Sequence, residues 1–481
     1  MKILLFLLLL MPTGCKKEDI SEAYKPDSIH VSKESLTLKV GESEQLKASP
    51  LPATAKELTF QWMSANPAVA TVSNGLVSAV AVGETVVTVG YANVKTDVAV
   101  KVNPPDPVVT GTLYDKTLSN KGSFSELLLN GAGQLTENGL SLTAGSNTVK
   151  LNKFYALAER KVQYTVRFSA DAKALFKSSE GDFNACIDVP NKRISIATSP
   201  VTQTSASFLK ADSDYLIEIY HIYQQSKVKI TDVQSGESAE VSATMDGQGG
   251  VGQGVVNPGF SVGMQWDYYC FGLQSGTSML VKKITVLALK SKVKLLIYGD
   301  SVSQPEGYFP TADFQKSWTQ QIISRLNGNG MSSGRGGGTI DTVLDYIKNE
   351  LPFIETEYVM VGIGTNGGNT EAKLSQLVEY IRLHGAIPIL NNVPCNESGT
   401  QVEINLLIAK IREKYGLKGC KFDWATSLNG DGKEVDKSMM YWENYTNGWG
   451  DIYHHPNEIG GQKMFERTLM DVPEIYESTK K

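Results

Sequence analysis

The sequence predicts a multidomain protein in which two all-β sandwiches are followed by an α/β domain with a doubly wound parallel sheet. Residues 27–103 and 104–292 both consist of short runs that alternate apolar and polar side chains and end at Gly, Asn, Ser or Asp, as antiparallel strands do. From residue 293 onward, apolar strand-like runs alternate with segments of helical period. We therefore expect three folded domains, at residues 27–103, 104–292 and 293–478.

The composition is that of a folded globular protein. Of the 481 residues, 41% are hydrophobic and 20% are charged, and the formal net charge is -5. This acidic balance, without any strongly basic cluster, argues against nucleic acid as a partner.

The N-terminus has the pattern of an export signal. Met1-Lys2 precede the apolar run ILLFLLLLM, which is too short to span a bilayer, and the small residues before Cys15 follow it. The pattern resembles a bacterial lipoprotein signal, which implies a signal peptide over residues 1–14, a lipid-modified Cys15 and a polar tether over residues 15–26. The alternative is an ordinary secretory signal. We expect an exported protein, periplasmic or on the cell surface, anchored to the membrane through Cys15.

Residues 27–103 predict a small β-sandwich. The phrases KVGESEQLKASPLPATA, FQWMSANPAVATVS and GLVSAVAVGETVVTV resemble the bacterial Ig-like group 2 domain over nearly its whole length. Domains of that family mostly serve as spacers or adhesion modules, so the resemblance implies no chemistry. We expect Trp62 to belong to the core of this domain.

Residues 104–292 predict a second, larger β-sandwich of jelly-roll or concanavalin-like type. The run Pro104-Pro105-Asp106-Pro107 cannot continue a sheet and marks the boundary. Helical period is scarce in this region apart from residues 171–177. Folds of this type often bind glycans, and the aromatic run WDYY at residues 266–269 is either a stacking surface for a sugar or part of the core.

Four cysteines remain once Cys15 is set aside, and export would permit disulfides. Each of the two later domains holds two of them. Pairing would join Cys186 to Cys270 and Cys395 to Cys420, and the alternative is four free buried thiols.

The third region alternates strands with helices, which implies a parallel doubly wound sheet. The expected helices cover residues 314–326, 340–351, 372–383, 402–415 and 461–470, and the expected strands include KLLIYG, YVMVGIG, AIPILNNV and the short run CKFDW.

Ser301 is the candidate nucleophile. It stands in KLLIYGDSVS, an apolar run that ends in Gly-Asp-Ser and reads as a strand entering a tight loop. Open α/β sheets place their functional groups at this carboxyl edge. Residues 359–368, VMVGIGTNGG, repeat the pattern, and Asn366 is a side-chain donor suited to a developing oxyanion.

The choice of a general base is narrow, because the chain has only five histidines. A serine hydroxyl becomes nucleophilic when a base, usually a histidine held by a carboxylate, takes its proton. His454 and His455 follow Asp451 at spacings of three and four residues, which face each other across one helical turn. Either ring could therefore be held by Asp451.

Four blocks of the third region resemble those of the SGNH (GDSL) hydrolases. They are GDS at residues 299–301, SSGRGGGT at 332–339, GTN at 364–366 and DIYHHP at 451–456. The resemblance covers residues 293–478 and implies a flavodoxin-like α/β/α fold. It also implies hydrolysis of esters, commonly acetyl or acyl groups on carbohydrates or lipids, without a cofactor.

The resemblance assigns roles to particular residues. Ser301 would be the nucleophile, His454 or His455 the base, and Asp451 the carboxylate that orients it. The oxyanion hole would be formed by the Ser301 amide, a glycine of the second block and Asn366. We expect no metal at this site.

Two departures from the family pattern matter, and the second block leaves a further choice open. Family members often have Asp where this chain has Gly367. His454 has the family's spacing from Asp451, whereas His455 stands next to the proline. We favour His454, because the carboxylate pairing decides the chemistry. Several glycines of the second block compete for one role, and we favour Gly334 or Gly336.

The substrate is suggested by side chains around the expected cleft. Residues 439–453 are unusually aromatic, and Trp442, Trp449 and Tyr453 could stack on sugar faces or pack the final loop. Arg335 could bind the carboxylate of an acidic sugar or remain solvated. We predict a serine esterase that removes acetyl or other small acyl groups, its substrate being an acylated carbohydrate or another small ester. The alternatives are a lipid-directed GDSL esterase or lipase, and a surface glycan-binding or adhesion lipoprotein with a hydrolase-like domain.

Overall fold

The computed structural model describes residues 26–53, 58–103, 111–178, 183–198, 201–244, 268–445 and 450–477, and of residues 444, 445, 450 and 451 it describes the backbone alone. The predicted signal peptide and Cys15 lie outside these residues. The chain divides into two compact units, residues 1–106 and 107–481. Within the described part of the chain, no helix has the length and apolar character needed to cross a membrane.

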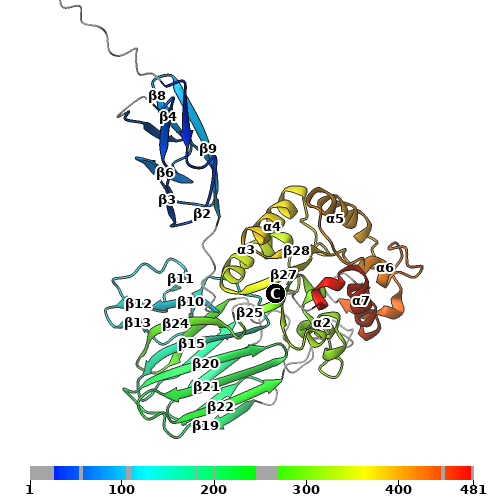
Figure 1. Ribbon diagram of the computed structural model, residues 1–481. Helices are drawn as coiled ribbons and strands as arrows, with labels where there is room; N and C mark the ends of the chain where they lie inside the picture. Colours follow the sequence, from blue (N-terminus) through cyan, green and yellow to red (C-terminus); the bar gives the residue numbers. More distant parts are fainter. Residues whose placement is uncertain are drawn as a thin grey trace, which may run out of the picture. The chain divides into compact units, whose positions relative to one another are not determined.

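The first unit is a small β-sandwich, as the alternation of its sequence predicted (Figure 1). One sheet has the strand order β2-β9-β8-β5 and another the order β3-β7-β6, while β1 pairs with β4. Every second residue of β8 and β9 enters one shared core, as Val87, Val89, Val98 and Val100 illustrate. Trp62 packs against that core. The strands are β1 Ser28–Val31, β2 Ser35–Lys39, β3 Ser43–Gln45, β4 Ala48–Leu51, β5 Gln61–Ser64, β6 Ala70–Ser73, β7 Leu76–Ala79, β8 Gly83–Tyr91 and β9 Val94–Asn103.

The second unit begins with a larger antiparallel sandwich. One sheet has the order β12-β13-β24-β15-β20-β21-β22, with β10 also paired to β24, and the other has the order β11-β14-β23-β16-β17-β18-β19. Tyr164 of the first sheet packs on Phe176 and Phe271 of the second, with ring centroids 4.9 and 5.2 Å apart, so the two sheets enclose an aromatic core. The strands are β10 Thr112–Thr117, β11 Leu127–Leu128, β12 Gly133–Thr136, β13 Gly139–Leu142, β14 Val149–Leu151, β15 Glu159–Phe168, β16 Lys173–Ser178, β17 Asn184–Asp188, β18 Arg193–Ile196, β19 Thr202–Ser205, β20 Asp214–Ile222, β21 Gln225–Asp232, β22 Ser238–Thr244, β23 Tyr269–Ser275 and β24 Met279–Ala288.

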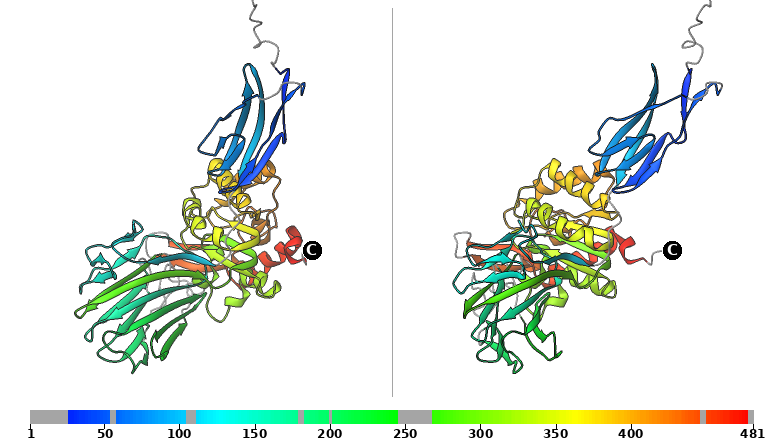
Figure 2. Two further views of the ribbon diagram at one scale, coloured as in Figure 1. Left: turned by 60° about the vertical axis from the view of Figure 1, so that its left-hand side comes forward. Right: turned by 90° about the vertical axis from the view of Figure 1, so that its left-hand side faces the viewer.

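The rest of the second unit is built on a four-stranded parallel sheet in the order β26-β25-β27-β28, with helices on both faces (Figures 1 and 2). Alternate residues of β25 enter different cores. Leu296 and Tyr298 share a cluster with residues of α3, α4 and α5, whereas Leu295 and Ile297 pack with residues of α2 and α7. A strand buried on both faces explains the uninterrupted apolar run of its sequence.

The elements of this α/β part follow one another with short connections. They are β25 Lys292–Gly299, η1 Ser301–Ser303, α1 Pro305–Tyr308, η2 Phe314–Lys316, α2 Trp318–Arg325, β26 Gly330–Gly334, α3 Ile340–Glu350, η3 Leu351–Phe353, β27 Glu355–Gly362, α4 Glu371–Leu383, β28 Ile387–Leu390, α5 Gln401–Tyr415, α6 Phe422–Thr426, η4 Lys437–Met439, β29 Met440–Tyr445, β30 Gly450–Pro456, α7 Glu458–Asp471 and η5 Pro473–Tyr476.

Two local predictions of secondary structure were wrong. Residues 173–177 of the stretch with apparent helical period belong to strand β16, because pairing with β17 and β23 on its two sides overrides a short local pattern. The run CKFDW is not a strand. The chain makes a single parallel bridge to β28 at Lys418 and then enters α6, where Phe422 packs on Trp318 with ring centroids 4.9 Å apart.

The structure decides between the two expectations for the cysteines, since the four cysteines of the described residues are free thiols. Cys186 lies on β17 and Cys270 on β23, and strand β16 lies between them. Strands two positions apart are separated by about 9.5 Å, beyond the reach of a disulfide. Cys395 and Cys420 belong to different hydrophobic clusters, and the Cys395 thiol donates to the Asp423 carbonyl at 3.3 Å.

Candidate active site

The parallel sheet brings three of the predicted blocks to one edge. Strand β25 ends at Gly299 and leads into η1, which begins with Ser301. Its neighbours β26 and β27 run parallel to it, so the loops that contain Gly336 and Asn366 leave the sheet at the same edge. Ser301 is 5% exposed, which leaves its side chain at the base of the site and not on open surface.

Asp300 fixes the turn that carries the serine. Its Oδ1 accepts a hydrogen bond from the Val302 amide at 3.1 Å, which caps η1, and its Oδ2 accepts one from the Thr365 amide at 3.2 Å. The side chain is 1% exposed, and burial raises the pKa of its carboxyl to about 6, although these amide donors oppose the rise. Asp300 therefore ties the loop after β25 to the loop after β27.

The second block approaches the serine turn very closely. A Cβ atom on Gly334 would lie 2.4 Å from the carbonyl carbon and oxygen of Ser303, so only glycine fits where β26 passes η1. The Gly336 amide donates to the Gln304 side chain at 2.7 Å, and the Arg335 amide donates to the Gly299 carbonyl at 3.0 Å. Of the two glycines favoured for the oxyanion hole, Gly336 therefore has an amide that already donates to a side chain of the protein.

Asn366 extends from the loop after β27 towards the second block. Its side-chain amide donates to the Gly338 carbonyl at 3.0 Å. The two loops expected to supply oxyanion donors are therefore in direct contact.

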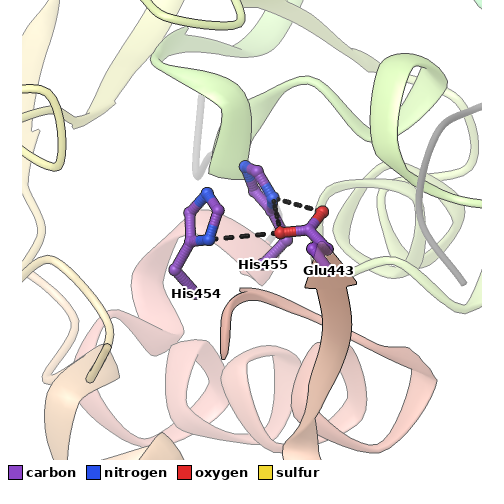
Figure 3. Close-up of side chains that lie close together, drawn as sticks. All are labelled: Glu443, His454 and His455. Carbon is purple, nitrogen blue, oxygen red and sulfur yellow. Dashed lines mark hydrogen bonds and ion pairs between the residues drawn. The ribbon is translucent and has the colours of Figure 1, made fainter. Parts of the chain in front are cut away.

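The histidines come from a β-hairpin. Strand β29 pairs antiparallel with β30, and a bulge between Met440 and Trp442 shifts the register. Figure 3 shows that Glu443 of β29 faces both His454 and His455 of β30. Glu443 is 4% exposed, so this carboxylate is buried beside the two imidazole rings.

His455 is the better held of the two rings. Its Nδ1 lies 2.8 Å from each Glu443 carboxylate oxygen, whereas the His454 Nδ1 lies 3.1 Å from one of them. The His455 Nε2 is buried and has no hydrogen-bond partner among the described residues. Burial lowers the pKa of His455 to about 3, so the ring is neutral at pH 7 and its Nε2 is a free proton acceptor.

Tyr308 connects this histidine to the serine. Its ring packs on His455 with centroids 3.9 Å apart. Burial raises the pKa of the Tyr308 hydroxyl, and a hydrogen bond with the Ser301 side chain opposes the rise. Strand β30 also packs directly against η1. Ser301, Tyr308, His455 and Glu443 thus form one continuous chain of contacts.

The predicted role of Asp451 rested on helical geometry that the chain does not have. Asp451 lies in strand β30, where residues three apart point to opposite faces and lie about 10 Å apart. The helical-turn spacing from His454 was therefore wrong. The side chain of Asp451 lies outside the described residues, so its role as an orienting carboxylate stays a prediction.

Glu443 was missed by the sequence reasoning. The signal that could have found it is the pair of short aromatic runs MYWENY and DIYHHP, separated by a turn-like TNGWG, which together predict a hairpin. A carboxylate in the first strand of such a hairpin is a candidate partner for a histidine in the second.

The predicted aromatic platform is only partly described. Trp442 is 40% exposed and lies directly opposite Tyr453 in the hairpin. The ammonium of Lys437 lies 4.8 Å from the centroid of the Tyr453 ring. Trp449 lies outside the described residues.

The same acidic and imidazole groups are also potential metal ligands. One ligand atom each from Glu443, His454 and His455 can be chosen so that all lie within 4.8 Å of one another. The His455 Nδ1 lies 2.8 Å from Glu443, which is a hydrogen-bond distance, whereas two ligands of one tetrahedral ion would lie about 3.3 Å apart.

Comparisons with known proteins identify the N-terminal domain. Residues 26–102 match the bacterial Ig-like domain (group 2) family. This match confirms the Ig-like prediction for the first domain. No curated protein matches the chain.

Three similar solved structures each align with little more than a third of the chain. The exoplasmic/lumenal domain of VIP36, solved with Ca²⁺ and Man3GlcNAc, has 10% identity over 37% of this chain and 90% of its own, with a TM-score of 0.28. Arcelin-5, a lectin-like defence protein from Phaseolus vulgaris, has 13% identity over 36% of this chain and 96% of its own, with a TM-score of 0.27. A GDSL-like lipase from Bacteroides thetaiotaomicron has 13% identity over 37% of this chain and 86% of its own, with a TM-score of 0.27.

Proposed function

We propose that the protein is a serine ester hydrolase in which Ser301 is the nucleophile, His455 the general base and Glu443 the carboxylate that orients it. The observation that carries this proposal is the state of His455, whose Nδ1 is held by Glu443 at 2.8 Å while its buried Nε2 has no hydrogen-bond partner among the described residues. A neutral imidazole in that arrangement can accept the proton of a serine hydroxyl.

The reaction proceeds in two steps. The Ser301 Oγ attacks the ester carbonyl while His455 Nε2 takes its proton, and the tetrahedral intermediate collapses as the alcohol leaves with that proton. Water then attacks the acyl-enzyme, His455 again accepts and returns a proton, and the carboxylic acid is released. Glu443 remains ionised throughout and stabilises the imidazolium. The Ser301 amide, a second-block glycine and the Asn366 side chain are the proposed oxyanion donors.

A small acyl group on a carbohydrate is the proposed substrate. The exposed Trp442 on strand β29 of the hairpin supports a sugar ring better than a long acyl chain, which would need a contiguous aliphatic surface. A lipid-directed esterase would use the same site, and a glycan-binding lipoprotein would use none of its chemistry. The N-terminal sequence supports export and a lipid anchor at Cys15.

Hydrolysis of 4-nitrophenyl acetate, butyrate and octanoate, with and without the Ser301→Ala substitution, tests the proposal. We expect turnover that falls with acyl length and that Ser301→Ala reduces by about ten-thousandfold or more. Turnover rising with acyl length would favour the lipid-directed enzyme. Equal rates for both proteins would contradict the proposal. Chelation with EDTA should leave the rate unchanged, and a loss that Zn²⁺ restores would assign Glu443, His454 and His455 to a metal.

A further inference from the structure

A cavity of about 340 Å³ lies where the large sandwich meets the second block. Two aromatic residues of the sandwich, Phe154 and Tyr268, line one side of it. The other side consists of the Gly-rich loop and the start of α3, with lining residues Arg335, Gly336, Gly337, Gly338, Asp341, Thr342 and Asp345. The cavity thus has walls from two parts of the same compact unit.

The two walls are held together by buried hydrogen bonds. The carboxylate of Glu350 at the end of α3 is fully buried, and its Oε1 accepts from the amides of Ala156 and Leu157 at 2.7 and 3.0 Å. Its Oε2 accepts from the Ser333 hydroxyl at 2.6 Å. Ser333 immediately precedes Gly334, so one carboxylate fixes the sandwich segment against the second block.

The lining offers the groups that recognise a hydroxylated ring. The rings of Phe154 and Tyr268 lie 5.4 Å apart and form an apolar wall. The Arg335 guanidinium, 6.0 Å from the Phe154 ring, supplies donors, and the carboxylates of Asp341 and Asp345 supply acceptors. Aromatic surface with a few converging polar groups is typical of a small-ligand site. Aliphatic side chains that would suit an acyl chain are absent from this lining.

Gly336 and Tyr308 connect the cavity to the proposed nucleophile. A Cβ atom on Gly336, which lines the cavity, would lie 2.5 Å from the Tyr308 hydroxyl. That hydroxyl forms a hydrogen bond with the Ser301 side chain. A ring seated in the cavity could therefore present an ester substituent towards Ser301 across Gly336.

We propose that this cavity binds the sugar ring that carries the ester, so that the large sandwich supplies one wall of the substrate site. This inference rests on the proposed esterase function and makes the sandwich part of the enzyme's specificity. Tyr268 and Asp345 are the specificity residues, one as a stacking surface and the other as an acceptor for sugar hydroxyls.

The test compares two acetyl esters that differ in their alcohol, β-D-glucose pentaacetate and 4-nitrophenyl acetate. We expect Tyr268→Ala and Asp345→Asn each to lower the ratio of kcat/KM for the sugar ester to that for the aryl ester by about tenfold. Tyr220→Ala is the matched control, because Tyr220 is another sandwich tyrosine whose ring lies beneath a lysine. The Lys227 ammonium lies 4.6 Å from the centroid of the Tyr220 ring, and the Lys150 ammonium lies 3.6 Å from that of Tyr268. Tyr220→Ala should leave both rates unchanged.

The outcomes separate this inference from the proposed function. Ser301-dependent hydrolysis of the aryl ester with an unaltered ratio in Tyr268→Ala and Asp345→Asn would overturn the sugar site and leave the esterase standing. Absence of Ser301-dependent hydrolysis of either ester would overturn both. Thermal unfolding of each variant, monitored by circular dichroism, shows whether a variant with a lowered kcat/KM ratio is still folded.

Discussion

The candidate site has two halves that are built by different means. One half is the edge of the parallel sheet, where Ser301 and Asn366 follow buried strands. The other is the hairpin β29–β30, which places Glu443 beside His454 and His455. The sheet edge is held by backbone pairing and by Asp300, whereas the hairpin half depends on one buried carboxylate shared by two rings.

This difference shows where each half is vulnerable. At the sheet edge the backbone fixes the positions of the functional groups, and Gly334 cannot acquire a side chain without moving Ser303. In the hairpin, the orientation of His455, the proposed base, depends on the hydrogen bond to Glu443. Substitutions in the hairpin should therefore change catalysis through the tautomer and orientation of the imidazole.

The largest effect should separate the two histidines. We expect His455→Ala to lower kcat for 4-nitrophenyl acetate by about ten-thousandfold, because it removes the ring that packs on Tyr308 and whose buried Nε2 has no hydrogen-bond partner among the described residues. His454→Ala should cost less than about tenfold. Steady-state kinetics on both purified variants decides the matter, and the opposite order would make His454 the base.

The next effect should identify the orienting carboxylate. Glu443→Gln keeps the size of the side chain but removes the charge that holds the His455 Nδ1, and we expect kcat to fall by about a hundred- to ten-thousandfold. Asp451→Asn should have a much smaller effect. A large loss in Asp451→Asn with little loss in Glu443→Gln would restore the family pattern of aspartate and histidine in one strand.

The smallest effect is on the pH dependence. Burial lowers the pKa of His455 from its ordinary value near 6.5 to about 3, so the base stays neutral well below pH 6. We expect kcat/KM to hold as pH falls from 7 to about 5, where an ordinary histidine would already be protonated. Rates measured across this range in buffers of constant ionic strength test it, and an acid limb near pH 6.5 would contradict it.

The same pKa has a consequence for stability. The unfolded chain binds a proton at this histidine below pH 6.5, whereas the folded chain does so only near pH 3. The folded state therefore loses stability as pH falls through that window. Thermal unfolding at several pH values should show a smaller decline for His455→Ala than for the unaltered protein.

The sequence by itself determined the β-rich sandwiches, the α/β region that follows them and the placement of Ser301 and Asn366 at one sheet edge. The alternating runs of the first two domains and the continuous apolar runs of the third are local patterns that predict strands. They are reliable because each face of a strand either packs on a core or contacts solvent. The positions of Ser301 and Asn366 at this edge could be predicted for the same reason, since each lies in the loop that follows a buried strand. The Ig-like domain was recognised from its own residues.

Tertiary structure alone decided the partner of the histidine and the wall of the cavity. Glu443 and His455 are twelve residues apart, and that spacing has no meaning until β29 and β30 pair. The bulge between Met440 and Trp442 shifts the register by one residue, and a shift of one residue sends a strand's side chains to the opposite face. Tyr268 and Arg335 likewise line one cavity, and Glu350 binds the sandwich backbone beside it, a long-range contact that no local pattern encodes.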